Sequence, residues 1–339
     1  MKRDYFLRPI NSYFKKDGSI AYKDVEVLSL DKNINLKVEN NLGIVSEDIS
    51  VNKVLFNKYK NLRSRINNIT NPSFPSQLSN FNKPILMGIV NVTQDSFFDG
   101  SNYFKYENAI KHAEKLIKDG ANIIDVGGES TKPGSLPIAV EEEIRRVKPI
   151  IKELSKNNII ISCDTRNSIT MQVALDSGAT IINDVSGLNY DKQTPKVLEQ
   201  YDCLYVLMHS IETPITMQNN PIYNNVACDI YSFFKEKILV LEKMNISNKR
   251  IILDPGIGFG KKGFHNFSLI KNLNIFLDIG NPIMIGLSRK SFIKKLVHKN
   301  SLVPSVLLAI KSYLNGAQIL RVHDVKETSE AINILDKVN

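Results

Sequence analysis

The stretch ENAIKHAEKLIKDGANIIDVGGES, residues 107–130, contains a helix pattern and a strand pattern in direct succession. Ile110, Ala113 and Ile117 recur at helical spacing and fall on one face, and Gly120 is typical of a helix end. The apolar run NIIDV at 122–126 then predicts a short buried strand. A helix followed at once by a buried strand is the repeating unit of proteins built on a parallel sheet.

Apolar runs of this kind recur along the chain, with amphipathic segments between most of them. They lie at 84–90, 122–126, 158–164, 179–184, 203–208, 250–254, 282–287 and 318–323. Eight strands alternating with helices over about 255 residues match the size and repeat number of a (β/α)8 barrel, so the sequence predicts a TIM barrel. A doubly wound parallel sheet remains the alternative, because a strand count from one sequence can err by one.

Residues 1–82 do not share this rhythm. Alternating stretches such as YKDVEVLSL (22–30) predict short β-strands, and the polar segment at 71–84 is typical of a linker. We therefore expect an N-terminal extension at 1–82 and a barrel domain at 83–339. The extension contains no chemical motif, and its role is open between a dimerisation element, a folding element and the remnant of a fusion partner.

The composition is that of an ordinary soluble globular protein, and its positive charge is read first as a solvated surface and second as a means of attracting anionic small molecules. The chain has 339 residues, of which 42% are hydrophobic and 23% charged, and its net charge is +9. The lysines are scattered rather than clustered with aromatic residues, which argues against nucleic-acid binding. The three cysteines form no CxxC pair, and the N-terminus has neither a signal-peptide core nor a run of membrane-spanning length. We expect a cytoplasmic protein that contacts no membrane.

The segment DPGIGFGKK, residues 254–262, raises the question of a phosphate-binding loop. A Walker loop needs a glycine where Pro255 stands and a hydroxyl residue where Lys262 stands. A dinucleotide-binding turn is also unlike it, because lysines replace the small residues that helix packing requires. The glycines must serve another purpose.

Polar residues follow every predicted strand, at the end where a barrel carries its active site. They are Asn91, Glu129 with Ser130 and Thr131, Asp164, Asn183, His209, Asp254, Ser288 to Lys290, and Arg321 with His323. Each could cap a strand or a turn instead, but their occurrence after all eight strands favours a site.

The chemistry of these residues describes three subsites. Asp164, Asn183 and Asp254 offer acceptors and donors that suit a flat heterocycle with a 2-amino-4-oxo edge. Arg321 and His323, two apart on one strand, point to the same side and suit an anion such as a diphosphate. The glycine-rich loop with Ser130 and Thr131 could hold anionic oxygens, and the turn at 288–292 offers a second basic site for a carboxylate.

The same residues resemble those of the dihydropteroate synthase family. The matching blocks are MGIVNVTQDSFFDG (87–100), IIDVGGESTKPGS (123–135), ISCDT (161–165), IINDVSG (181–187), LMHS (207–210) with TPITMQ (213–218), ILDPGIGFGK (252–261), IGLSRKSFI (285–293) and RVHDVKET (321–328). They occur in the family's order. The resemblance implies a (β/α)8 transferase of folate biosynthesis, which joins 7,8-dihydropterin-6-ylmethyl diphosphate to 4-aminobenzoate and releases pyrophosphate. It also implies a homodimer.

The resemblance implies a role for each matching position. The implied catalytic residues are Asp164, Asp254, Lys290, Arg321 and His323, and the implied pterin-binding residues are Asp164, Asn183, Met208, Asp254 and Lys290. The implied diphosphate-binding residues are Ser130, Thr131, Arg321 and His323, and Asn91 would help to hold Mg²⁺. The implied aminobenzoate-binding residues are Phe97, Pro133, Phe259, Lys290 and Ser291. The loops depart from the family at Gln94, where proline is usual, at Phe98, where a small residue is usual, and at Lys132, where arginine is usual. These departures put substrate affinity and sulfonamide response in question more than the reaction.

Two other functions remain open from the sequence. A pterin-dependent corrinoid methyltransferase would share the barrel and the carboxylates but would need no pyrophosphate site. A barrel that binds or assembles without catalysis would not need Asp164, Asp254, Lys290, Arg321 and His323 together.

Overall fold

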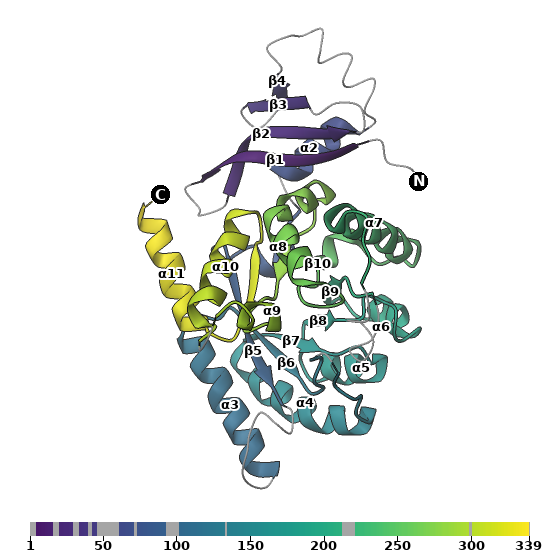
Figure 1. The fold of residues 1–339 in the computed structure, drawn as a ribbon. Helices are drawn as coiled ribbons and strands as arrows, with labels where there is room; N and C mark the ends of the chain where they lie inside the picture. The colour runs from purple at the N-terminus through teal and green to yellow at the C-terminus, as the bar shows by residue number, and fades with distance from the viewer. Residues whose placement is uncertain are drawn as a thin grey trace.

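A computed structural model of the chain describes residues 5–15, 20–29, 34–39, 43–45, 61–70, 73–92, 102–132, 134–211, 221–297 and 300–338. Two sheets are present in these residues: an eight-stranded parallel sheet and, before it in the chain, a four-stranded antiparallel sheet. Figure 1 shows the parallel strands surrounded by helices, with the smaller sheet at one end of this assembly.

The parallel strands alternate with helices along the whole barrel. The strands are β5 (Ile85–Asn91), β6 (Ile123–Gly127), β7 (Ile160–Asp164), β8 (Ile181–Asp184), β9 (Leu204–Met208), β10 (Ile251–Asp254), β11 (Met284–Ile285) and β12 (Ile319–Val322). The helices are α3 (Asn102–Lys118), α4 (Val140–Leu154), α5 (Ser168–Asp176), α6 (Thr194–Gln200), α7 (Val226–Lys243), α8 (Gly263–Lys271), α9 (Ser291–Lys294), α10 (Leu302–Leu314) and α11 (Val325–Val338), with short 3-10 turns η3 (Ser155–Asn157), η4 (Asn248–Arg250) and η5 (Leu273–Ile279).

The sheet closes on itself. Its strand order is β10-β9-β8-β7-β6-β5-β12-β11, and a parallel bridge between Leu253 and Ile283 joins the two ends. The Leu253 N–H also donates to the Pro282 carbonyl at 2.8 Å. A doubly wound sheet has two open edges, so this closure excludes it and confirms the predicted (β/α)8 barrel. All eight predicted strands are present.

Alternate strand residues fill the barrel interior. Ile85 and Met87 of β5, two apart, are fully buried there, and so are Leu204 and Val206 of β9. Leu78 belongs to the same cluster although it lies before the first barrel strand, in the short turn η1 (Ser76–Leu78). The polar segment that the sequence indicated as a linker therefore inserts Leu78 into the barrel, and Phe74 and Phe81 pack against the same cluster. These three apolar residues stand among prolines, serines and asparagines, a composition that predicts a loop, which is why the pattern missed their burial.

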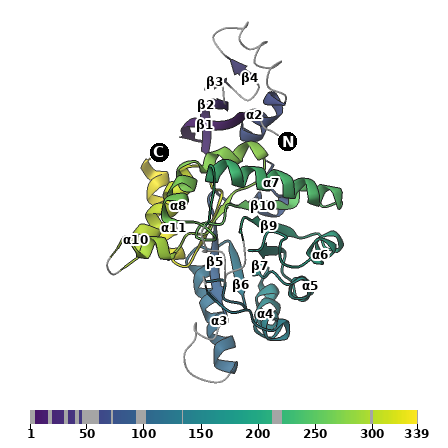
Figure 2. The ribbon, with the colours of Figure 1, turned by 45° about the vertical axis from the view of Figure 1, so that its right-hand side comes forward.

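The N-terminal extension forms a sheet and a helix. Strands β1 (Tyr5–Phe14), β2 (Ile20–Ser29), β3 (Ile34–Glu39) and β4 (Gly43–Val45) pair in order, and α2 (Leu62–Thr70) follows. The expected short strands are therefore present. Figure 2 shows the sheet and α2 beside α7 and α8, away from the opposite end of the barrel where α3 begins.

The extension packs on η5 of the same chain. Leu7, Val25 and Leu62 are buried in one cluster with residues of η5, including Phe276 and Leu277. This contact lies at the end of the barrel where β11 begins, because η5 immediately precedes that strand.

Polar contacts fix the same interface. The Arg65 side chain pairs with Asp278, and Nε donates to Oδ2 at 2.9 Å. Asn68 Nδ2 donates to the Asp278 carbonyl at 2.9 Å, and Ser73 N donates to the Gly280 carbonyl at 3.1 Å. The extension is thus part of the packed fold.

Within the described parts of the chain, the structure contains no helix long and apolar enough to cross a membrane.

Candidate active site

The ends of β5 to β8 bring three predicted site residues together. Asn91 pairs in register with Gly127, Gly127 with Asp164, and Asp164 with Asn183. A Cβ atom on Gly127 would lie 3.6 Å from Asn91 Oδ1 and 3.7 Å from Asp164 Oδ2. The glycine therefore leaves room for both side chains to converge on the barrel mouth, as the strand-end argument predicts.

Arg321 lies among carboxylates. Its Nε donates to Asp125 Oδ2 and its Nη2 to Asp164 Oδ2, each at 2.6 Å. Asn183 Nδ2 donates to the same Asp125 oxygen at 3.1 Å. The sequence placed Arg321 in the diphosphate subsite; here its guanidinium also borders the heterocycle subsite.

Asp125 is a residue that the sequence analysis missed. It is fully buried on β6, between apolar neighbours in the run NIIDV. A carboxylate in a strand buried on both faces is rare unless it is paired, so its position was a usable signal. The strand-end rule does not select it, because it lies inside the strand and not after it.

Several oxygens at this point have no protein donor. Among the residues that the structure describes, Oδ1 of Asp125, Asp164 and Asn183 is buried without a hydrogen-bond partner. Buried polar atoms are normally paired, so three unpaired acceptors close together call for a ligand that brings donors. A heterocycle with amino and ring N–H groups would supply them.

Asp254 and Lys290 belong to the same cluster of charged side chains as Arg321. Asp254 Oδ1 accepts from the Gly256 N–H at 2.7 Å, and a Cβ on Gly286 would lie 4.0 Å from Asp254 Oδ2 and 3.6 Å from Arg321 Cδ. Lys290 Nζ lies 4.2 Å from the centroid of the Phe259 ring. A cation over an aromatic face is attracted to it, so Phe259 and Lys290 hold each other in place.

Burial shifts the protonation of these groups. It raises the pKa of Asp164 to about 7, with Asp125 adding to the effect and Arg321 opposing it. Burial also raises the pKa of Asp254, although the Gly256 N–H and Lys290 oppose the change. Burial and Arg321 lower the pKa of Lys290 to about 8. Buried charged groups that titrate near neutral pH are typical of active sites.

An apolar cluster lines the mouth beside the charged residues. It consists of Val185, Met208 and Phe259, all largely buried. Met208 lies in register with Asp254 on the neighbouring strand. A flat ring held by carboxylates needs such a surface for its faces, so the cluster fits the heterocycle subsite.

The glycines of DPGIGFGKK serve the shape of this loop. Gly256 has a φ of +69°, and a Cβ on it would lie 2.0 Å from the His209 carbonyl oxygen. Only glycine tolerates that conformation and approach. Lys261 is buried and donates from Nζ to the Phe259 carbonyl at 2.8 Å and toward His209 Nδ1 at 3.0 Å. The lysine therefore anchors the loop internally and is not presented to a phosphate.

The diphosphate set is divided between the β6–α4 loop, which carries Ser130 and Thr131, and the end of β12, which carries Arg321 and is followed by His323. Ser130 Oγ is 2.9 Å from Ser135 Oγ, which holds the β6–α4 loop across its width. His323 Nδ1 is 3.2 Å from Ser288 Oγ, and burial together with Arg321 lowers the pKa of His323 to about 3. The imidazole is therefore neutral and would serve as a hydrogen-bonding group rather than a cation.

The aminobenzoate set is only partly described. Phe97 and Pro133 lie outside the described residues, as do the family departures Gln94 and Phe98. Ser291 is the exposed first residue of α9, and Lys290, not Ser291, is the N-cap of this helix. Because α9 has only four residues, its terminus supplies little of the field expected for a carboxylate site.

Arg289 does not join Lys290 in a basic site. It adopts a φ of +58°, and its Nε donates to Asp324 Oδ2 at 3.1 Å. This ion pair links the turn after β11 to the turn after β12. The sequence could not show it, because the contact depends on a left-handed residue that is not glycine.

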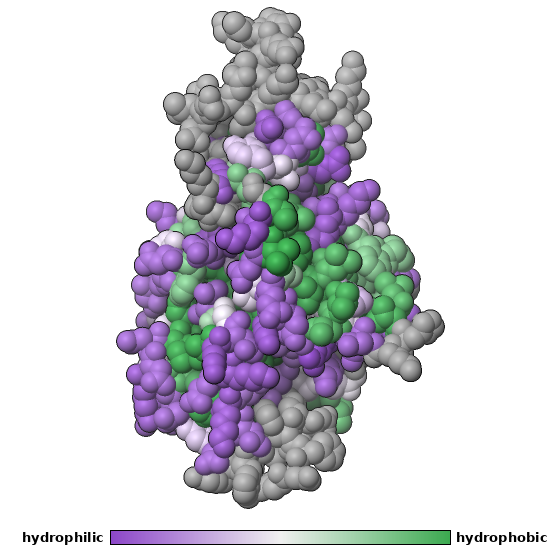
Figure 3. Space-filling view, turned by 90° about the vertical axis from the view of Figure 1, so that its left-hand side faces the viewer, coloured by the Kyte–Doolittle hydropathy of each residue, from purple (hydrophilic) through white to green (hydrophobic). Residues whose placement is uncertain are grey.

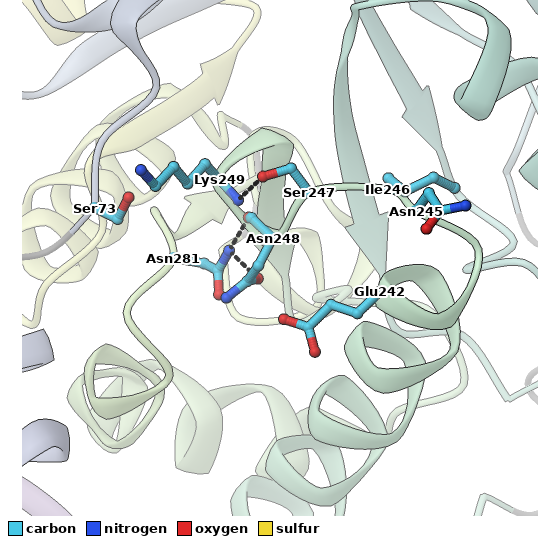
Figure 4. Close-up of a pocket in the computed structure, with 8 residues that line it drawn as sticks. All are labelled: Ser73, Glu242, Asn245, Ile246, Ser247, Asn248, Lys249 and Asn281. Atoms are coloured by element: carbon cyan, nitrogen blue, oxygen red, sulfur yellow. Dashed lines mark hydrogen bonds between the residues drawn. The ribbon is translucent and has the colours of Figure 1, made fainter.

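A separate hollow lies at the other end of the barrel. It measures about 500 Å³ and is lined by Ser73, Glu242, Asn245, Ile246, Ser247, Asn248, Lys249 and Asn281 (Figure 4). Asn248 precedes β10 and Asn281 precedes β11, so this hollow is at the amino ends of the strands. It contains none of the predicted site residues.

Comparison with known proteins identifies the family. The family model described as pterin binding enzyme matches residues 87–323. The chain belongs to the pterin-binding enzyme family. The dihydropteroate synthase of Escherichia coli strain K12 is 40% identical over 260 residues, which cover 75% of this chain and 91% of that protein.

Solved structures agree with this membership. The Xanthomonas albilineans dihydropteroate synthase with 4-aminobenzoic acid is 36% identical, with a TM-score of 0.71 over 76% of this chain and 93% of that one. The same enzyme in complex with 7,8-dihydropteroate is 34% identical, with a TM-score of 0.69 over 76% and 94% of the two chains. The predicted function, a dihydropteroate synthase of folate biosynthesis, is confirmed by these relatives, and the methyltransferase and non-catalytic alternatives lose their support.

Proposed function

We propose that the barrel mouth carries the reaction as the residue roles predict. The pterin would lie between the carboxylates of Asp164 and Asp254 and the surface of Met208 and Phe259. The single observation that carries this proposal is the group of buried, unpaired oxygens on Asp125, Asp164 and Asn183, which match a donor-rich heterocycle.

The reaction exchanges one bond for another at the pterin methylene carbon. The C–O bond to the diphosphate breaks, the amine nitrogen of 4-aminobenzoate forms a C–N bond, and that nitrogen loses a proton. Positive charge that develops on the pterin would be stabilised by Asp164 and Asp254. Preorganised charges of this kind, aimed at where charge develops, make a large contribution to catalysis.

The leaving diphosphate gains negative charge as the C–O bond breaks. Arg321 would stabilise it, with His323, Ser130 and Thr131 as hydrogen-bond donors. Arg321 already contacts Asp164 at 2.6 Å, so one guanidinium borders both regions where charge changes. No nucleophilic side chain is required.

We propose that Mg²⁺ accompanies the diphosphate, with Asn91 as a protein ligand. Asn91 offers a neutral oxygen at the strand end, within reach of the space beside Gly127. Among the described residues, no three His, Cys, Asp or Glu side chains gather as a metal site. One amide oxygen, completed by phosphate oxygens and water, suits the way Mg²⁺ is commonly bound. When bound, the ion would neutralise charge on the diphosphate.

Thermal unfolding tests the diphosphate subsite and its metal together. A ligand that binds only the folded state raises the apparent melting temperature. We expect pyrophosphate with Mg²⁺ to raise the melting temperature and pyrophosphate with EDTA to raise it less. In the Asn91→Ala variant, the rise in melting temperature should be the same with Mg²⁺ as with EDTA. Equal protection with and without Mg²⁺ would refute the metal assignment.

We also propose a homodimer. Phe264 and Phe267 of α8, Leu296 after α9, and Val303 and Leu307 of α10 are exposed apolar side chains on neighbouring helices. Figure 3 shows hydrophobic residues gathered on the face that carries α10. Exposed apolar patches of this kind are typical of subunit interfaces. Sedimentation at micromolar concentration would contradict the proposal if it found only a monomer.

We further propose that the protein is cytoplasmic. We also propose that it consists of an N-terminal extension, residues 1–82, and a barrel domain, residues 83–339. All three cysteines are free thiols, and two of them are buried, which suits a reducing compartment. The family model starts at residue 87, after the extension. Recovery of the native protein from an extracellular or membrane fraction would contradict the compartment.

A further inference from the structure

The β6–α4 loop, which carries Ser130 and Thr131, is fastened at its base by Glu129. Glu129 Oε1 accepts from the backbone N–H of Ile138 at 3.3 Å, so one side chain holds both ends of the loop. The same carboxylate accepts two hydrogen bonds from Arg166: Nε to Oε2 at 2.8 Å and Nη2 to Oε1 at 2.9 Å.

Arg166 connects this loop base to the strand of the pterin subsite. It lies two residues after Asp164, in the turn that leaves β7. Its guanidinium carbon lies 4.1 Å from the centroid of the Tyr190 ring, which covers it from the β8 side. A planar guanidinium held bidentately and stacked on a ring has little freedom, so Glu129 is fixed relative to Asp164.

A second carboxylate links the same two turns. Glu143 of α4 accepts from Asn167 Nδ2 at 2.8 Å and from Thr170 Oγ1 at 2.6 Å. A Cβ on Gly128 would lie 3.1 Å from Glu143 Cγ, so the loop base packs directly on this link. The base of the β6–α4 loop and the start of α5 therefore contact the same side chain, Glu143.

The buried ion pair of Glu129 and Arg166 is not explained by a gain in folding stability. Glu129 and Arg166 are only 7% and 5% exposed. Removing two charges from water offsets most of their attraction, so a buried ion pair is weak evidence for a stabilising role. The geometry of the pair, in contrast, holds the loop that carries Ser130 and Thr131 in a fixed position relative to Asp164.

We propose that Glu129 and Arg166 are positioning residues that couple the diphosphate subsite to the pterin subsite. This inference rests on the proposed function. The pair touches no substrate. It holds the β6–α4 loop so that Ser130 and Thr131 meet the diphosphate of a pterin already held by Asp164.

The experiment compares two affinities in one set of folded variants. Arg166→Lys keeps the charge but loses the bidentate fork. We expect the dissociation constant for pyrophosphate with Mg²⁺ to rise about tenfold to a hundredfold, as for other small misplacements of a site group. The dissociation constant for 6-hydroxymethyl-7,8-dihydropterin, which has no diphosphate, should stay unchanged.

Two further variants keep the test decisive. Arg65→Lys weakens a buried arginine–carboxylate pair at the far end of the barrel and should change neither affinity, whatever it does to the melting temperature. If Arg166→Lys does not fold, the double variant Glu129→Gln with Arg166→Gln leaves no unpaired charge and should show the same selective loss.

The outcomes separate the two proposals. Wild-type protein that binds no pyrophosphate would contradict the proposed diphosphate subsite. Wild-type protein that binds pyrophosphate, together with folded variants that bind it equally well or lose both ligands alike, would overturn the positioning role alone.

Discussion

At the scale of single residues, the site is a group of charges whose protonation depends on burial. In the proposed mechanism, Asp164 and Asp254 are ionised when they stabilise a positively charged pterin, and Lys290 is protonated when it serves as a cationic donor. Burial works against the charged form in each case, because the interior solvates charge poorly. The pKa of Asp164 is raised to about 7 and that of Lys290 is lowered to about 8.

These shifts predict a bell-shaped pH profile. The value of kcat/KM reports the free enzyme, so it should rise as pH increases through about 7, where Asp164 loses its proton. It should fall above about 8, where Lys290 loses its proton. Steady-state rates between about pH 5.5 and 9.5, with unfolding followed in the same buffers, measure this. A flat profile for a folded enzyme would show that neither group controls the reaction.

Residue chemistry alone predicted most of the side chains that the structure gathers at the barrel mouth. The strand-end rule selected Asp164, Asn183, Asp254 and Arg321 because parallel strands of a barrel meet at their carboxyl ends. It could not find Asp125, the second carboxylate that pairs with Arg321, since Asp125 lies inside a strand and 196 positions away in the chain. That contact depends on the pairing of β12 with β5, which a local sequence pattern does not contain.

At the scale of elements, the barrel strands were easier to predict than the extension. Strands buried on both faces are continuous apolar runs, so their sequence signal is strong. The sequence signal of the extension is weaker. Strand β1 contains Pro9 and shows little alternation of apolar and polar residues, so this strand was not predicted. Proline lacks a backbone donor, but β1 is an edge strand of its sheet, where that loss is tolerated.

The extension should contribute stability without contributing to the site. Leu7 of β1 is fully buried against the barrel cluster, so Leu7→Ala should destabilise the folded protein by about 2–5 kcal/mol. Denaturant unfolding measures this loss. Pyrophosphate binding should not change under conditions where the variant is folded, because the extension and the strand ends lie at opposite ends of the barrel.

A matched variant calibrates that expectation. Ile334 on α11 is 67% exposed, so Ile334→Ala should change stability by no more than about 0.5 kcal/mol. If Leu7→Ala were as mild as Ile334→Ala, the extension would not be packed on the barrel as described. That result would favour the interpretation of the N-terminal extension as the remnant of a fusion partner.

At the scale of the whole molecule, the barrel separates stability from chemistry. The amino ends of the strands are closed by Leu78 and by the extension, whereas the carboxyl ends carry the charged residues and the glycine-rich loops. This division is general in such barrels. Lys132, the one of the three family departures that the structure describes, is exposed in the β6–α4 loop at this carboxyl end.

The most direct test is pyrophosphate release by the purified protein in the presence of Mg²⁺. We predict release only when 7,8-dihydropterin-6-ylmethyl diphosphate and 4-aminobenzoate are both present, with 7,8-dihydropteroate formed in equal amount. Asp254→Asn and Arg321→Ala should each lower kcat/KM by about a hundredfold or more, as expected for loss of a preorganised charge. Arg65→Lys should leave the rate unchanged. Release that needs only one substrate, or unchanged rates in the Asp254 and Arg321 variants, would contradict the assignment of the barrel mouth as the synthase site.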